Sequence, residues 1–148
     1  MCEKLEYCIV IALLSYHSIF DLKVKRIPRW SLSAAVVFSF LWAFGKIFLG
    51  TQTWGTLVLS LLPGMATLAM AVVTRQQIGF GDGWELIVMG NMLGAAACVI
   101  GLAVALLVVF FVCVILLLRH KVGRNTEIPF VPFLCAGTIV SLLLHFIA

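Results

Sequence analysis

The sequence predicts an all-α polytopic membrane protein with six transmembrane helices and both termini on the extracytoplasmic side. Of its 148 residues, 64% are hydrophobic and only 11% are charged, whereas soluble domains average about 45–50% apolar and about 25% charged residues. Long uncharged runs follow one another with short gaps, and the basic residues are concentrated in alternate gaps. Because each crossing takes about 20 residues, we expect residues 1–148 to form a single transmembrane domain.

The first three spans are expected over residues 5–20, 31–49 and 54–73. The first run ends at Asp21 and lacks both the basic start and the small-residue cleavage site of a signal peptide, so we expect it to remain as a span. Residues 86–118 form an uncharged stretch that, as one helix, would be about 50 Å long against a hydrocarbon core of about 30 Å. It should therefore fold back between Gly94 and Gly101. The sixth span is expected over residues 132–148.

The basic residues give an independent test of six spans. Only Lys4 and Lys46 fall on one side of the predicted bundle, and the other eight of the ten fall in three gaps that share the opposite side. The positive-inside rule makes that second side cytosolic. The eight are Lys23, Lys25, Arg26, Arg29, Arg75, Arg119, Lys121 and Arg124. They lie in short loops without interleaved aromatic residues, so no nucleic-acid partner is expected.

The cysteines and histidines do not predict a metal site. The five cysteines contain no Cys-x-x-Cys pair and lie mostly within apolar runs, which disfavours zinc and a disulfide framework. His120 and Glu127 would need further ligands that their loop does not supply. We therefore expect no metal and no cofactor.

Two aspartates concentrate the predicted chemistry. Asp21 closes the first span and Asp82 opens the fourth, both at the cytosolic end. Ionisable groups near hydrocarbon are costly and usually face a bundle interior or a water-filled cavity. If the two converge, they hold one proton between them, so that one acts as base and the other as acid on a water molecule. Three glycines alternate around Asp82, and without a Cβ they let an extended substrate backbone approach. They are Gly79, Gly81 and Gly83.

A structural role for the same residues stays open. Asp82 with Glu85 three residues later has the spacing of a helix capping box. Asp21 lies close to four cationic residues and would suit an interfacial ion pair. A third possibility is a small proton-coupled transporter that uses both aspartates as a relay.

Other polar and small residues are weaker candidates. His17, four residues before Asp21, is expected to be a packed polar residue near the helix end or a hydrogen-bond partner of Asp21. Gly90 and Gly94 have the spacing of close helix packing, and Asn91 should bond to a neighbouring helix. A serine-type site is disfavoured because three serines in the spans lack a His or Lys partner. These are Ser15, Ser18 and Ser60.

Three motifs, in this order, resemble those of the type IV prepilin peptidase family. Asp21 is followed by basic residues and Ile27-Pro28, residues 79–82 read Gly-Phe-Gly-Asp, and residues 128–134 read Ile-Pro-Phe-Val-Pro-Phe-Leu. The resemblance implies a membrane aspartic endopeptidase in the plasma membrane of a prokaryote that cleaves the basic leader of prepilins or pseudopilins at the cytosolic face, in pilus assembly or protein secretion. It also implies that Asp21 and Asp82 are catalytic, with Pro28 beside them.

The chain departs from the family pattern at three positions. Arg29 stands where Asn is frequent, Trp84 where Lys is frequent, and Val131 where the motif has Gly. These changes affect the expected substrate fit and leave both aspartates intact. The two Cys-x-x-Cys pairs of the longer, methylating members are absent from the sequence, so methyltransferase activity is not expected. A catalytically silent assembly subunit is the remaining alternative, and the sequence leaves the oligomeric state open.

Overall fold

The structure, a computed structural model, describes residues 2–24, 27–74, 79–119 and 129–147. These residues form six helices and no strand. The helices are α1 (Cys2–Val24), α2 (Arg29–Phe48), α3 (Trp54–Val73), α4 (Phe80–Leu93), α5 (Ala95–Leu118) and α6 (Val131–Ile147). The predicted roles of Lys25, Arg26, Arg75, His120, Lys121, Arg124, Glu127 and Ile128 fall outside the described residues.

The predicted all-α class and the number of helices are confirmed. Helix α3 matches its predicted span residue for residue, and α1 continues one turn beyond the predicted end, so that Asp21 lies inside its last turn. The uncharged stretch breaks at Gly94, whose φ of 87° lies in the left-handed region that glycine adopts without strain. Gly101, the other end of the expected turn region, lies within α5.

Four helices, α1, α2, α3 and α5, are long and apolar enough to cross a membrane. Helix α5 is the most apolar, with a mean hydropathy of 3.4 over a window of which only 11% is buried, so most of its surface suits contact with lipid. Helices α4 and α6 have 14 and 17 residues and are shorter than the roughly 20 residues of a full crossing. The chain is accordingly a multi-pass membrane protein, and two of its six predicted crossings, α4 and α6, are shorter than a typical span.

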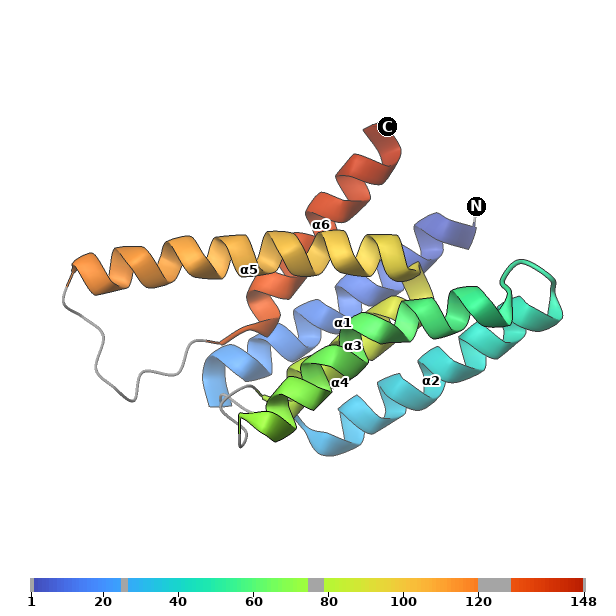
Figure 1. Cartoon of the computed structure of the whole chain (residues 1–148), viewed down its shortest axis with the longest axis horizontal. Helices are drawn as coiled ribbons and strands as arrows, with labels where there is room; N and C mark the ends of the chain where they lie inside the picture. The colour runs from blue at the N-terminus through green and yellow to red at the C-terminus, as the bar shows by residue number, and fades with distance from the viewer. Residues whose placement is uncertain (1, 25–26, 75–78, 120–128, 148) are drawn as a thin grey trace.

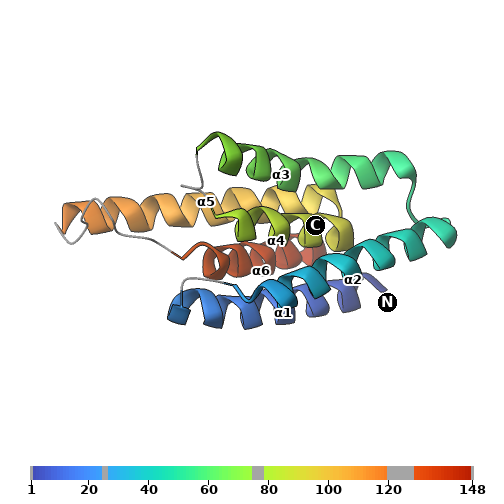
Figure 2. The same ribbon diagram turned by 90° about the horizontal axis from the view of Figure 1, so that it is seen from below.

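Successive helices run in opposite directions through the bundle (Figure 1). The end of α1 and the start of α4 lie at one end of the bundle, and the α2–α3 turn lies at the other end with the chain termini. Helix α4 is in the middle, packed against α1, α2, α3 and α5 (Figure 2). Its residues 85–92 are all buried, as expected of a helix that is covered on every side. This packing sets the start of α4 beside the end of α1.

Small residues permit the close packing of α4 on α3. A Cβ on Gly90 would collide with the backbone carbonyl oxygen of Ser60 in α3. The packing role predicted for Gly90 is therefore confirmed. The pairing of Gly90 with Gly94 is wrong, because no atom lies within 4 Å of a Cβ built on Gly94 and that residue serves the turn into α5.

Candidate active site

Asp21 lies partly buried in the last turn of α1, against the start of α6. The backbone N–H of Val131 donates to its Oδ2 over 3.2 Å, and Phe130 supplies a second backbone hydrogen bond. The first N–H groups of a helix have no partner within the helix and attract carboxylates. The Pro-Phe-Val-Pro segment thus holds Asp21 across a separation of 110 residues.

Asp82 is the third residue of α4 and is also partly buried. The N-terminal cap of α4 is Gly79, whose carbonyl oxygen accepts the Asp82 N–H over 3.2 Å, and no side chain caps the helix. The capping-box interpretation of Asp82 and Glu85 is therefore wrong. It requires Asp82 to be the N-terminal cap, whereas the cap is Gly79, three residues earlier. Glu85 is turned into the bundle interior instead.

The two aspartates lie close enough for their charges to interact. The same holds for Asp82 and Glu85. The structure thereby brings together, from α1 and α4, the two acids singled out in the sequence, and it adds a third carboxyl group. Two carboxyl groups in such proximity resist simultaneous ionisation, which is the basis of acid–base catalysis by a shared proton.

One of the predicted loop glycines, Gly79, lies directly at Asp82, and Gly81 lies against a different residue. A Cβ on Gly79 would stand 3.1 Å from the Oδ2 of Asp82, so this glycine packs directly on the carboxyl group. A Cβ on Gly81 would meet only the side chain of Ile27, with its Cδ1 also at 3.1 Å. A side chain at position 81 would therefore press only on the flexible side chain of Ile27.

Gly83 and Pro28 have structural neighbours of their own. Gly83 is buried on the α3 side, where a Cβ would stand 2.6 Å from the Cδ2 of Leu68. Pro28 is the N-terminal cap of α2, and its carbonyl oxygen accepts the N–H of Leu32 over 3.1 Å.

A buried polar cluster lies beside the aspartates, and its pairing was missed at the sequence level. His17 contacts the carboxylate of Glu85 through Nδ1, and both side chains are fully buried. Its Nε2 lies 2.7 Å from the Oγ of Ser31 in α2. One signal was present in the sequence: His17 precedes Asp21 by one helical turn, and Glu85 follows Asp82 by nearly one turn.

The other polar predictions are met in part. Asn91 donates to the Oγ of Ser39 in α2 over 3.2 Å, as expected. Ser18 and Ser60 donate to backbone carbonyl oxygens of their own helices. No group of three or more His, Cys, Asp or Glu residues that would hold a metal occurs in the described part of the chain.

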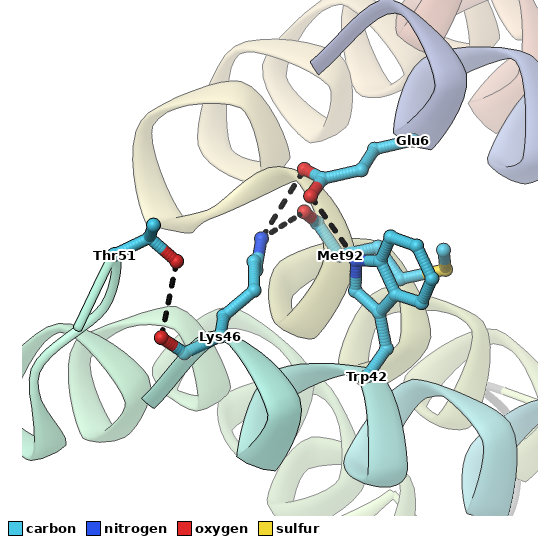
Figure 3. A network of polar contacts seen from close by, with 5 residues as sticks. All are labelled: Glu6, Trp42, Lys46, Thr51 and Met92. Atoms are coloured by element: carbon cyan, nitrogen blue, oxygen red, sulfur yellow. Dashed lines mark hydrogen bonds and ion pairs between the residues drawn. The ribbon is translucent and has the colours of Figure 1, made fainter. Parts of the chain in front are cut away.

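A second polar network ties α1, α2 and α4 at the opposite end of the bundle (Figure 3). The carboxylate of Glu6 accepts from the Nε1 of Trp42 over 3.0 Å and from the Nζ of Lys46 over 3.2 Å. Lys46 also donates to the carbonyl oxygen of Met92, in the last turn of α4, over 2.8 Å. The two networks hold the same three helices together at different depths.

Comparison with known families decides the assignment. The model of the type IV leader peptidase family matches residues 8–119, which include both aspartates and the glycines around the second. The chain belongs to the type IV leader peptidase family. It is thus an aspartic endopeptidase of the prepilin peptidase class. No curated protein and no solved structure matches the chain.

The family match ends before α6. The C-terminal resemblance noted in the sequence lies outside that match, and the bond from Val131 to Asp21 shows only that this segment lies at the first aspartate. In this peptidase the third motif reaches the first aspartate through the backbone.

Proposed function

We propose that the peptidase removes the short basic leader of prepilin or pseudopilin proteins at the cytosolic face of the membrane, with Asp21 and Asp82 as its catalytic residues. The observation that carries the proposal is the convergence of these two acids, from α1 and α4, at one end of the bundle. Both lie within the segment that matches the family.

In the proposed reaction the two carboxyl groups share one proton. One removes a proton from water as the water attacks the scissile carbonyl carbon, and the other protonates the developing oxyanion and then the leaving amine. Gly79 and Gly81 leave room for the extended peptide beside Asp82. This proposal needs no metal or cofactor.

The cytosolic placement rests on charge. Lys23, Arg29 and Arg119 lie at the end of α1, the start of α2 and the end of α5, on the side of the bundle where α4 begins, and Lys46 lies at the opposite end. By the positive-inside rule, this distribution supports a cytosolic position for the aspartates and an extracytoplasmic position for both termini. Fusions at residue 50 and at the C-terminus should be active with alkaline phosphatase, which needs export, and dark with green fluorescent protein. The reverse pattern would overturn the orientation.

The catalytic proposal is tested by replacing each acid with its neutral isostere. Asp21→Asn and Asp82→Asn should insert at wild-type levels and lose at least about 1,000-fold in leader cleavage, and the double variant should be no worse, because residues that act as one unit are not additive. Cleavage is followed as a gel shift of a co-expressed prepilin, with peptidase levels measured in the same membranes.

Glu6→Gln is the matched control, since it also converts a carboxyl to an amide. Glu6 is buried at the far end of the bundle, where it accepts hydrogen bonds from Trp42 and Lys46. It should retain cleavage. Normal cleavage by a well-expressed Asp82→Asn variant would refute the proposal. Absence of cleavage by the wild type against several prepilins would instead favour the silent assembly subunit.

A further inference from the structure

A third carboxyl group beside a catalytic pair of acids can compete with the pair for the proton that they share. Glu85 lies nearly one turn along α4 from Asp82, close enough for their charges to interact. If it carried an uncompensated negative charge, it would compete for the proton that the two aspartates hold. Catalysis by the two aspartates alone therefore requires that the negative charge of Glu85 be neutralised.

His17 is in place to do this. Its Nδ1 contacts the Oε1 of Glu85, and both side chains are fully buried. Burying a net charge is expensive, so a buried histidine–carboxyl pair holds one proton between them and is neutral as a unit, whichever partner carries it.

Nothing else in the described residues takes over this task. The second carboxylate oxygen of Glu85, Oε2, is buried and has no hydrogen-bond partner within that part of the chain. The other face of the imidazole is fixed by Ser31, whose Oγ lies 2.7 Å from Nε2. The ring is thus held from α2 while it faces Glu85 on α4.

We propose that His17 is a positioning residue that acts through Glu85, neutralising this carboxyl group so that Asp21 and Asp82 alone share the catalytic proton. The proposal rests on the proposed function, since it presupposes that the two aspartates catalyse cleavage. It assigns His17 an effect on the charge of Glu85, in addition to its packing between the helices.

The charge argument predicts an unusual pattern of rescue. His17→Leu leaves a lone carboxyl group at Glu85, and kcat for leader cleavage should fall about tenfold or more, the effect of one pKa unit of competition for the proton. KM should change little, because the substrate does not contact the pair. Glu85→Leu removes the third carboxyl group and leaves the imidazole bonded to Ser31, so its effect on kcat should be small. The double variant His17→Leu/Glu85→Leu should regain most of the activity lost in His17→Leu.

A second pair of variants keeps the test valid if leucine disturbs folding. His17→Gln retains an N–H donor toward Glu85 but cannot carry the proton, so kcat should fall, and adding Glu85→Gln should restore it. The assay uses the full-length purified peptidase in lipid vesicles with a purified prepilin. If either double variant is as poor as its His17 single variant at equal protein level, the pair is packing alone and the inference fails.

Lys46→Met is the matched control. It removes the cation from another largely buried carboxyl group, Glu6, on the same helices and far from the aspartates. It should lower thermal stability while leaving kcat at the wild-type value, and an equal fall in kcat would refute a charge effect specific to His17. Asp82→Asn keeps the two claims apart: if it still cleaves, the proposed function fails, whatever His17 does.

Discussion

A single backbone hydrogen bond links α6 to the first aspartate, and Val131→Pro removes it without removing a side-chain interaction of Asp21. Proline lacks the N–H that donates to Asp21 over 3.2 Å. Position 131 is the first residue of α6, where the proline ring is tolerated because its fixed φ suits a helix start. The substitution therefore isolates one donor.

The expected effect follows from the chemistry of this bond. A hydrogen bond to a charged group contributes about 1.5–3 kcal/mol, and the lower value applies because Phe130 supplies a second backbone donor. If the bond orients Asp21 for reaction, about 1.5 kcal/mol corresponds to a loss of about tenfold in kcat/KM. We expect that loss relative to Val131→Ala, which also truncates the buried side chain but keeps the N–H.

The assay is prepilin cleavage by both variants in lipid vesicles, with thermal unfolding of each in detergent micelles. Their unfolding temperatures should agree within a few degrees. Equal kcat/KM for Val131→Pro and Val131→Ala would show that the contact from α6 does not matter for catalysis. The third motif would then be only a means of anchoring α6.

Glycine substitutions separate packing from substrate approach. Gly90→Ala should destabilise the fold by about 1–3 kcal/mol, because its Cβ would collide with the Ser60 backbone. Gly45→Ala, with no atom within 4 Å of its Cβ, should stabilise α2 by about 0.5–1 kcal/mol. Thermal unfolding in micelles measures both changes, and a Gly90→Ala variant as stable as Gly45→Ala would contradict the packing. Gly81→Ala meets only the end of the Ile27 side chain, so stability should be unchanged while KM for prepilin rises; an unaltered KM would remove Gly81 from the substrate path.

Hydropathy and charge predicted most of the fold. Uncharged runs located the helices because backbone polar groups in lipid must be satisfied within a helix. A break between Gly94 and Gly101 was foreseen, since a helix of 33 uncharged residues would be longer than the membrane is thick. The burial of α4 in the middle of the bundle was not foreseen, because hydropathy does not separate a helix buried in a bundle from one that faces lipid.

The site was only half predictable. Asp21 and Asp82 stand out because isolated acids at the ends of apolar runs are costly. The partner of Glu85 was missed because helix-start patterns are local, whereas the neighbour that it meets, His17, lies on another helix. The backbone donor of Val131 was equally hidden, since an N–H is present at every residue except proline.

The shortness of α4 has a consequence for how the protein sits in the bilayer. Its 14 residues span only about 21 Å, less than the roughly 30 Å hydrocarbon layer, so at least one end must lie within that layer. Carbonyl groups at a helix end need partners at such depth, and the ammonium of Lys46 provides one at Met92. An end of α4 within the hydrocarbon layer is compatible with the proposed position of Asp82 at the water boundary. Under the proposed function, a peptide would then reach the acids from the membrane interface and would not have to enter the centre of the bilayer.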